Sequence, residues 1–386
     1  MMKSMLKKLY FHTPLVTLLG ILLLAGACQQ SSQEESEASS ESATDTTLTS
    51  IMSDTLDAIS EPLVDHMYTA DPSAHVWNGT LYIYPSHDIE SGIPQDDMGS
   101  HFNMKDYHVF SMDSVGGEVT DHGVALSVDE VPWAERHMRG PDAAKKGDQY
   151  YFYFPAKDTA DIFRIGAATG DSPTGPFNPQ PEPIEGSYSI DPAVYKDTDG
   201  EYYMYFGGIW GGQLQRWDTG EYVEEDTYPR MSEPALAPEV ARMSDDMLSF
   251  AEEPRDVEIL DQNGDPITAG DNERRFFEAA WVHKYDGTYY FSYSTGDTHY
   301  IAYATGDSPY GPFTYQGIIL EPVIGWTSHH SIAESEGQWY LFYHDTEFPC
   351  GQTPPPQYQD DAASRIMPDC SIETIDPYRD CIASIV

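Results

Sequence analysis

Basic residues are scarce in this chain. Among its 386 residues, 20 are Lys or Arg and 64 are Asp or Glu, so the formal net charge is −44. A surface this acidic repels a phosphate backbone at long range, which argues against nucleic acid as a partner. The acidity otherwise indicates a well-solvated surface suited to salty surroundings.

Cysteine is also rare, with four residues in the whole chain. None belongs to a Cys-x-x-Cys pair or has the Cys/His spacing of a zinc site. Three of them, Cys350, Cys370 and Cys381, follow one another near the C-terminus. In an exported protein two of the three can form one disulfide, which leaves one thiol over. We therefore predict that a disulfide between two of these three cysteines holds the C-terminal tail in place, and the sequence does not say which two pair.

The N-terminal apolar run is too short for a membrane span. Leu15–Leu24 follows three lysines and falls short of the about 18 residues that a transmembrane helix needs. Small residues at 25–27 then precede Cys28, an arrangement that resembles a bacterial lipobox. We predict that residues 1–27 are a lipoprotein signal peptide and that Cys28 carries lipid. A cleaved signal peptide with an incidental cysteine is the alternative.

The segment after Cys28 has few apolar residues. Residues 29–50 are rich in Ser, Glu and Thr and cannot bury a core, so residues 28–58 are predicted to form a flexible tether ahead of a domain at 59–386. Acidic residues directly after the cysteine resemble a surface-export tag of some Gram-negative lipoproteins. We expect an exported protein whose lipid anchors it at the outer membrane or cell surface, with the periplasm as the alternative location. The lipid is the only membrane contact expected.

From Asp71 onward the sequence lacks any amphipathic helix of useful length. Short apolar and aromatic runs alternate with Gly, Pro, Asn and Asp, as is typical of an all-β chain. One unit recurs five times, with a polar first residue, a short strand, a turn such as Asn-Gly or Asp-Gly, and an aromatic strand. The units begin at Asp71, Asp142, Asp191, Glu278 and His329.

Five such units predict an all-β, five-bladed β-propeller that forms a single domain. A second repeat, IGAATGDSPTGPF from Ile165 and IAYATGDSPYGPF from Ile301, is expected to supply a following strand, and residues 217–272 are expected to form an insertion. The first strand of each blade lines the central channel, so the five unit-starting residues should meet at one mouth. Four acids and a histidine there need a cation, a substrate or a shared proton to offset their repulsion.

The chain from about Glu61 to His344 resembles glycoside hydrolase family 43. The resemblance lies in TADPSAHVWNGTLYIYPSHD, SIDPAVYKDTDGEYYMYFGG, RRFFEAAWVHKYDGTYYFSYSTGDTHY and GWTSHHSIAESEGQWYLFYHD, in that order. It implies a five-bladed propeller that hydrolyses arabinose- and xylose-containing glycans with inversion. The β-xylosidases and α-L-arabinofuranosidases of the family are the most similar.

The resemblance also implies three catalytic roles. Asp71 matches the general base that activates water, Glu278 the general acid, and Asp191 the residue that tunes the pKa of the acid. Inversion requires the acid and base to lie roughly 6.5–9.5 Å apart, so that a water molecule fits between them and the sugar. Burial against Phe276, Phe277 and Trp281, together with the charge of Asp191, is expected to raise the pKa of Glu278.

Each assignment has a structural alternative. An Asp before Pro is commonly a turn residue, and Glu278 could instead pair with Arg274 or Arg275. The resemblance further implies that His329 helps to hold a calcium ion, largely through water, whereas a buried, hydrogen-bonded structural histidine is the alternative. His330 should then point to the opposite side of the strand.

Three further residues are candidates for binding the sugar. Asp142 matches an acid that lines the pocket, or it is a structural carboxylate at a strand start. Trp133 is a candidate stacking platform, with core packing as the alternative. Trp210, which sits among glycines that let a ligand approach closely, is a second candidate for the same role. The chain carries Arg139-Gly140-Pro141-Asp142 where relatives commonly have Trp-Ala-Pro-Asp, which places a cation beside the pocket.

Three functions follow from these residues. The first is an inverting exo-hydrolase that releases xylose from the non-reducing end of β-xylosides or xylo-oligosaccharides. The second is an α-L-arabinofuranosidase acting on arabinose-substituted glycans. The third, from another class, is a surface lipoprotein that binds glycan without cleaving it. The presence of all three carboxylates favours an enzyme with an oligosaccharide or polysaccharide substrate.

Overall fold

The computed structural model describes residues 63–345, except 65, 90, 95, 97, 218–219 and 323–327, together with the backbone of a strand at 369–375. All of it belongs to one compact unit, residues 56–386. The predictions for the signal peptide, Cys28, the tether and the tail cysteines fall outside the side chains described. Within the described part, no helix has the length and apolar character needed to cross a bilayer.

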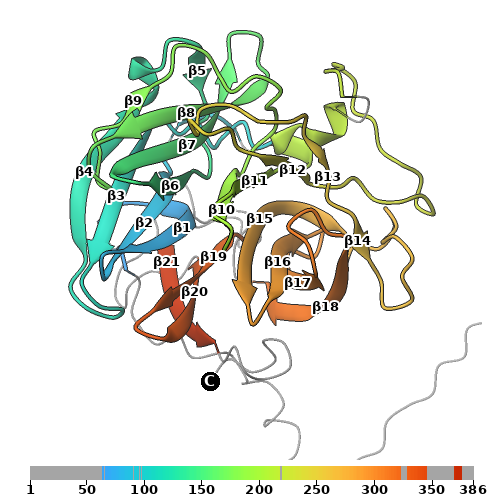
Figure 1. The fold of residues 1–386 in the computed structure, drawn as a ribbon. Coiled ribbons are helices and arrows are strands. Elements are labelled where there is room, and N and C mark those ends of the chain that lie inside the picture. Colours follow the sequence, from blue (N-terminus) through green and yellow to red (C-terminus); the bar gives the residue numbers. More distant parts are fainter. Residues whose placement is uncertain are drawn as a thin grey trace, which may run out of the picture. The chain divides into compact units, whose positions relative to one another are not determined.

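The described chain is almost entirely β-structure, as predicted, and its helical segments are the single turns η1 (Val128–Glu130), η2 (Trp210–Gly212) and η3 (Leu214–Arg216). The strands form five sheets (Figure 1). The first sheet contains β1 (Thr69–Trp77), β2 (Thr80–His87), β3 (Asp106–Met112) and β4 (Thr120–Ser127), and the second contains β5 (Ala134–Arg136), β6 (Asp142–Lys146), β7 (Gln149–Asp158), β8 (Phe163–Gly170) and β9 (Asn178–Pro179). The third sheet contains β10 (Ala193–Lys196), β11 (Tyr202–Phe206), β12 (Glu239–Arg242) and β13 (Arg255–Asp256), and the fourth contains β14 (Ile259–Leu260), β15 (Phe276–Tyr285), β16 (Thr288–Thr295), β17 (Ile301–Gly306) and β18 (Phe313–Leu320). The fifth sheet contains β19 (His330–Ser335), β20 (Gln338–Asp345) and β21 (Asp369–Ile375).

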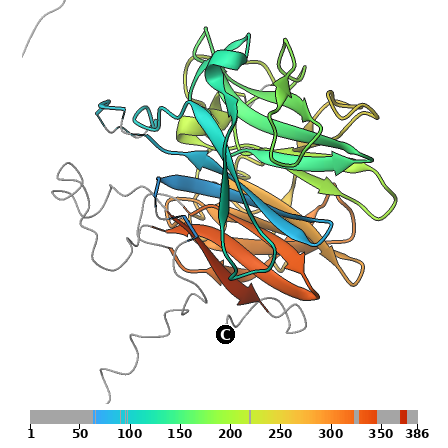
Figure 2. The same cartoon turned by 90° about the vertical axis from the view of Figure 1, so that its left-hand side faces the viewer.

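The inner strands close a ring around a central channel. β1 contacts β6 and β19, β10 contacts β6 and β15, and β15 contacts β19. Each inner strand comes from a different sheet, so the sheets are the five blades of a propeller. Figure 2 shows the ring from the side, with the long strands running from one face of the domain to the other. The predicted five-bladed fold is confirmed.

Tight turns join the first and second strands of the blades, as the repeats predict. Asn78 and Gly79 have φ values of 58° and 85°, and Asp286 and Gly287 have 46° and 83°. Positive φ at both central residues is the requirement of a type I′ turn, which Asn-Gly and Asp-Gly meet at little cost. The turns at residues 147–148, 199–200 and 336–337 likewise connect the first and second strands of the other three repeat units.

The aromatic second strands fill the spaces between neighbouring blades. Tyr84 of β2 packs against Phe152 of β7 with ring centroids 5.9 Å apart, and Tyr205 of β11 packs against Phe291 of β16 at 6.0 Å. All four side chains are fully buried. Such tilted pairs are favourable beyond the apolar area that they bury, so the high aromatic content is largely explained by contacts between blades.

The expectation of an insertion at residues 217–272 is wrong in part. β12 and β13 are the outer strands of the third blade, and β14 pairs in parallel with β18 at the edge of the fourth. These strands contain only two to four residues. A strand this short shows little of the alternation from which strands are predicted.

Candidate active site

Four of the five unit-starting residues meet at one mouth of the channel. The Nδ1 atom of His329 lies 3.1 Å from Oδ1 of Asp71 and 3.9 Å from Oδ2 of Asp191. The backbone N–H of Ala279, the residue after Glu278, donates to Oδ2 of Asp191 over 3.0 Å. Asp191, Glu278 and His329 are buried, and the side chain of Asp71 is 15% exposed. The convergence predicted from the repeat is confirmed for these four residues.

Irregular backbone aims these side chains into the channel. The pairing of β1 with β2 shifts register around Asp71, and β15 shifts register on both sides of Glu278. Asp71, Asp191 and Ala279 have positive φ values of 52°, 55° and 60°. Bulges and left-handed non-glycine residues cost energy and concentrate at functional sites, where they redirect side chains.

Side chains of Ser86, His329 and His344 surround Asp71. The hydroxyl of Ser86 donates to Oδ2 over 2.9 Å, while the backbone N–H of Asp71 donates to Nδ1 of His344 over 3.0 Å. Burial would raise the pKa of Asp71. The charge of His329 and hydrogen bonds from His329 and His344 outweigh burial and hold this pKa well below its usual range. Asp71 is therefore ionised at neutral pH.

Glu278 has the opposite electrostatic environment. A Cβ atom added to Gly208 would lie 2.6 Å from Ile190 and 3.3 Å from Cβ of Glu278, so the absence of a side chain at Gly208 lets this loop close over the acid. Burial first, and the charge of Asp191 second, raise the pKa of Glu278 from 4.5 to about 8, although His329 opposes them. Glu278 therefore keeps its proton at neutral pH, and the two predicted causes are confirmed.

The interpretation of Glu278 as the partner of a neighbouring arginine is wrong. Arg274 pairs with Asp271 at 2.5 Å, and Arg275 pairs with Asp297 at 2.8 Å. The aromatic neighbours also differ in position. Phe276 and Phe277 are buried beside the acid in sequence, whereas Trp281 donates to the carbonyl of Ile332 and packs against His75 farther along the channel.

Asp191 and His329 complete the charge arrangement. Burial, opposed by the charge of His329 and reinforced by that of Asp71, raises the pKa of Asp191 to about 6. Burial would lower the pKa of His329, but the charges of Asp191 and Asp71 raise it to about 9. His330 points away as predicted, with its Nε2 atom 2.6 Å from the hydroxyl of Ser292.

Asp142 does not line the pocket, and the prediction that it binds a sugar hydroxyl is wrong. Its side chain is fully buried, where it accepts hydrogen bonds from Ser73, from His75 at 2.6 Å and from the backbone N–H of Val194. These partners belong to β1 and β10, so Asp142 ties the inner strands of three blades together. The structural alternative is the one observed.

Gly140 occupies the place at the mouth that the repeat assigned to Asp142. A Cβ atom at Gly140 would lie 3.0 Å from Cβ of Asp71 and from Cε1 of His329, and 3.2 Å from Oδ1 of Asp191. The neighbouring Arg139 donates to the carbonyl of Gly99 over 3.0 Å. Its positive charge acts to lower the pKa of both Glu278 and Asp191. The cation predicted beside the pocket is therefore present.

The two candidate tryptophans occupy different surroundings. Trp210 is half-buried and meets Phe277, the residue before the acid, edge to face at 5.2 Å. Trp133 is also half-buried, and its ring stacks on Phe154 with centroids 6.0 Å apart. Trp210 thus borders the acid, whereas the contacts of Trp133 belong to the apolar core around Phe154. Sugar stacking on either ring stays a prediction.

The sequence did not single out Asp88, Ser86 or His344. Asp88 is buried, no described residue donates to either carboxylate oxygen, and burial followed by the charge of Asp71 raises its pKa to about 7. All three residues lie at or just beyond the ends of second strands, β2 and β20. A hairpin returns its second strand to the mouth at which the first begins. Polar residues at the end of each aromatic second strand are therefore the sequence feature from which Ser86, Asp88 and His344 could have been predicted.

The charge at this mouth is compatible with a bound calcium ion. Three ionisable acids besides Glu278 surround it, and the oxygens of Asp88 accept no hydrogen bond from the described residues. Calcium takes six to eight oxygen ligands, more than Asp71 and Asp191 offer around His329, so water would have to supply most of the coordination. The donor set fits an ion held mainly through water.

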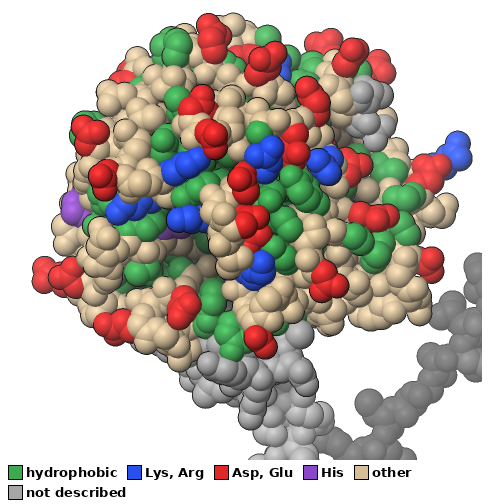
Figure 3. All heavy atoms as spheres, in the orientation of Figure 1, with side chains coloured by type: hydrophobic (Ala, Val, Ile, Leu, Met, Phe, Trp, Pro, Cys, Tyr) green, Lys and Arg blue, Asp and Glu red, His purple; other side chains and the backbone are tan. Residues whose placement is uncertain are grey.

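The other end of the channel has a different character. A cavity of about 730 Å³ opens there, lined by side chains that include Trp77, Trp339, Lys145, Lys196 and Lys284. Figure 3 shows Lys and Arg side chains gathered around a hollow in the middle of one face, with Asp and Glu scattered over it. Asp71, Asp191 and Glu278, the acids at the mouth where His329 lies, do not line this cavity.

Comparison with known proteins identifies the family. The family model described as "Glycosyl hydrolases family 43" matches residues 60–359. The chain is 62% identical over 284 residues to a xylosidase/arabinosidase of Bacteroides ovatus, which covers 73% of this chain and 87% of that protein. It is 54% identical over 280 residues to a β-xylosidase of Xylanibacter ruminicola, covering 72% and 88%.

Solved structures show the same architecture. A β-xylosidase/α-arabinofuranosidase from a compost microbial metagenome, in complex with xylotriose and calcium-free, superposes with a TM-score of 0.78 at 60% identity and covers 84% of this chain and 96% of its own. An enzyme from Xanthomonas citri, complexed with xylotriose, superposes with a TM-score of 0.76 at 52% identity, covering 85% and 93%.

Proposed function

The chain belongs to glycoside hydrolase family 43, and from this premise we propose that it is an inverting exo-hydrolase that releases xylose from the non-reducing end of β-xylosides and xylo-oligosaccharides. Relatives at 62% and 54% identity are named as a xylosidase/arabinosidase and a β-xylosidase. Structural neighbours at 60% and 52% identity hold xylotriose. A xylose-containing oligosaccharide is therefore the substrate class that we assign.

The observation that carries this proposal is the opposite protonation of two carboxyl groups at one mouth. The pKa of Glu278 is raised to about 8, whereas that of Asp71 is held well below its usual range. An inverting glycosidase needs one protonated and one ionised carboxyl group at neutral pH. We assign Glu278 as the general acid and Asp71 as the general base.

The reaction then proceeds in one displacement. Asp71 takes a proton from a water molecule, whose oxygen attacks the anomeric carbon as the glycosidic C–O bond breaks. Glu278 donates its proton to the departing oxygen, and the configuration at the anomeric carbon inverts. Asp191 keeps Glu278 protonated through its negative charge, and exchange of protons with solvent restores both carboxyl groups.

Two neighbours hold the base in place. Ser86 donates to one oxygen of Asp71, and His329 lies 3.1 Å from the other. With both oxygens restrained, the carboxylate has one orientation toward the water. Trp210, next to Phe277, is the aromatic residue best placed to stack on a sugar near the acid. We include Trp133 as a second, more distant platform.

Two substitutions test the assignment of acid and base. Glu278→Ala should reduce xylobiose hydrolysis by 10²–10⁴-fold, the range typical of general-acid catalysis. It should reduce hydrolysis of a nitrophenyl β-xyloside less, because nitrophenolate departs without a proton. Asp71→Ala should abolish both reactions, since each needs an activated water. Near-native turnover of xylobiose by either variant would contradict the assignment.

Two other outcomes distinguish the remaining candidate functions. A panel of nitrophenyl glycosides separates β-xylosidase from α-L-arabinofuranosidase activity, which the name of the Bacteroides ovatus relative joins. Binding of xylo-oligosaccharides with no product over long incubation would indicate a glycan-binding lipoprotein instead. Proton NMR of fresh product should show α-xylose first, as inversion requires.

We further propose that the enzyme is exported, lipidated at Cys28 and anchored at the outer membrane or cell surface. The support is the short apolar run followed by small residues and a cysteine. In a bacterial host, labelled fatty acid should enter the native chain but not Cys28→Ala. Release of the native chain from membranes by high salt alone would contradict a lipid anchor.

Calcium is proposed as an ion held beside His329 through water. The surplus of acids at this mouth supports it. When bound, the ion would supply positive charge that offsets the repulsion among the acids at this mouth and holds them in place. Chelation should therefore lower activity, and added calcium should restore it. Equal activity with chelator and with calcium would contradict the site.

A further inference from the structure

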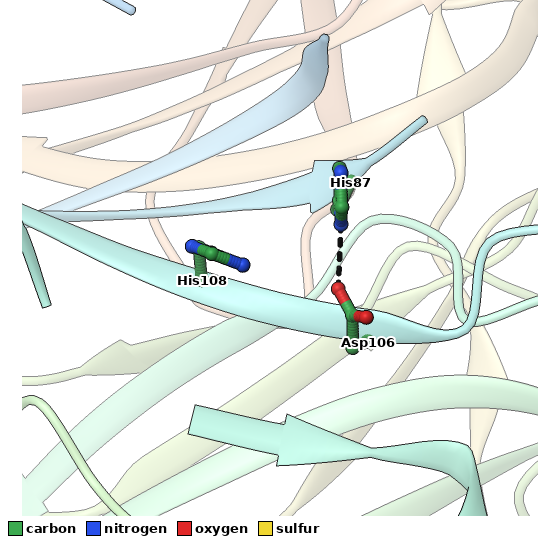
Figure 4. A group of neighbouring side chains, drawn as sticks. All are labelled: His87, Asp106 and His108. Atoms are coloured by element: carbon green, nitrogen blue, oxygen red, sulfur yellow. Dashed lines mark hydrogen bonds and ion pairs between the residues drawn. The ribbon is translucent and has the colours of Figure 1, made fainter. Parts of the chain in front are cut away.

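A second cluster of metal-binding side chains lies on the first blade. Asp106 and His108 stand two residues apart on β3, on the same face, and His87 lies opposite them at the end of β2. Nδ1 of His87 is 2.5 Å from Oδ1 of Asp106, and the two imidazole centroids are 5.3 Å apart. One ligand atom from each residue lies within 4.8 Å of the others (Figure 4). The strand pairing thus preassembles three potential ligands.

His108 is held by a carboxylate in the way that metal-binding histidines are. Its Nδ1 atom lies 3.0 Å from Oδ1 of Asp121 on β4, and Asp121 also accepts the backbone N–H of Gly123 over 2.7 Å. An imidazole that gives its Nδ1 proton to a carboxylate presents the lone pair of Nε2. Figure 4 shows a ring nitrogen of His108 directed toward the side of His87 and Asp106.

The cluster extends to the segment before the first blade. The second oxygen of Asp121 lies 2.9 Å from Nε2 of His66. The side chains of His87, Asp106 and His108 are 19%, 26% and 15% exposed. They are close to the surface, where a metal ion can enter, and still restrained by the sheet. Water can complete the coordination from the exposed side.

We propose that His87, Asp106 and His108 form a binding site for a divalent transition-metal ion of the zinc type. Two imidazoles and one carboxylate suit Zn²⁺, Co²⁺ or Ni²⁺, whereas Ca²⁺ and Mg²⁺ prefer sets of oxygen ligands. The ion replaces the direct contact between His87 and Asp106. Nitrogen and oxygen ligands about 2.0–2.2 Å from zinc need only small rotations of these side chains.

The site joins parts of the blade that are separate in sequence. Its ligands come from β2 and β3, its supporting carboxylate comes from β4, and His66 precedes β1. Ser86, the residue before His87, holds an oxygen of Asp71. A metal ion bound here fixes the mouth-facing end of β2 and stabilises the first blade. The site is separate from the mouth where His329 lies and independent of the proposed hydrolase activity.

Zinc uptake by the full chain without a histidine tag tests the proposal. After treatment with chelator, the native chain should bind one equivalent of Zn²⁺ more than the His87→Ala/His108→Ala double variant by titration calorimetry. Co²⁺ should give visible absorption bands of a nitrogen- and oxygen-ligated ion that the double variant lacks. His122→Ala is the matched control, since His122 is an exposed histidine of β4 that contacts Ser111, and it should bind metal as the native chain does.

A supporting-residue variant keeps the test decisive if the double variant fails to fold. Asp121→Asn leaves all three ligands in place and should weaken zinc binding 10–100-fold, the usual effect of removing such a partner. Zinc should also raise the melting temperature of the native chain and not that of the double variant. Equal zinc stoichiometry in the native chain and the double variant would overturn the proposal. So would unchanged affinity in Asp121→Asn.

Discussion

Replacement of Asp191 by Asn should shift the pH range in which the enzyme works. Asp191 has a pKa of about 6, so it is negatively charged at the pH where Glu278, with a pKa of about 8, loses its proton. Asn has nearly the same shape, and its carbonyl oxygen can still accept the N–H of Ala279. The substitution therefore removes the charge and leaves most of the geometry.

The size of the shift follows from the causes acting on Glu278. The rise of its pKa from 4.5 to about 8 corresponds to roughly 5 kcal/mol against the ionised form, at about 1.4 kcal/mol per pKa unit. Burial is the largest cause and persists in Asp191→Asn, so the pKa should stay above 4.5. A single close charge is worth about 1–3 units. We expect the basic limb of kcat/KM to move down by about 1–2 pH units.

The assay is xylobiose hydrolysis from pH 5 to pH 10, because in the proposed mechanism the departing sugar oxygen takes its proton from Glu278. Activity of the native chain should fall as pH rises through about 8, and that of Asp191→Asn at lower pH. Asp199→Asn is a matched control in the same blade, since Asp199 is an exposed turn residue. A basic limb that stays in place, or moves upward, in Asp191→Asn would refute the electrostatic role of Asp191.

Three further predictions concern the surroundings of the site. Asp142→Ala leaves Ser73, His75 and the N–H of Val194 without their buried acceptor, so it should lower the free energy of unfolding in urea by about 3–5 kcal/mol. KM for xylobiose should stay unchanged; a raised KM at native stability would restore a sugar-binding role. Ser86→Ala removes a hydrogen bond that orients Asp71, so kcat for xylobiose should fall with KM unchanged; an unchanged kcat would contradict this. The raised pKa of His329, about 9 against 6.5, contributes stability that is present below pH 6.5 and lost as pH rises to about 9. This loss of roughly 3 kcal/mol adds to the loss that the raised pKa of Glu278 causes over the same range. Urea unfolding at pH 6 and pH 9 should therefore show a smaller loss in His329→Gln than in the native chain, and an equal loss in that variant would contradict the contribution of His329.

The repeat predicts the fold because each unit contains its own hairpin. The turn pairs set the hairpins, and the aromatic strands fix which faces pack between blades. The short strands β12 to β14 were missed since two to four residues leave no measurable alternation. Their pairing depends on β11 and β18, which lie far away in the sequence.

The sequence predicted the active site at the first strands and missed it at the second. Asp71, Asp191, Glu278 and His329 were placed correctly because the repeat aligns their positions. Asp142 was misplaced because in the second blade Gly140, two residues earlier, lies at the mouth. Residues two apart on a strand point to the same side, so the repeat alone does not distinguish these two positions. Packing between blades, which no single unit encodes, decides which of the two lies at the mouth.

Burial alone cannot explain why Glu278 is neutral and Asp71 is ionised at neutral pH. Burial acts to raise the pKa of Asp71, Asp191 and Glu278 alike. Asp71 differs because the charge of His329 and the hydrogen bonds with His329 and His344 favour its ionised form. For Glu278, the next cause after burial is the negative charge of Asp191, which favours the neutral form. The difference in protonation therefore depends on neighbours supplied by blades three and five, and only the closed ring brings those blades to Asp71 and Glu278.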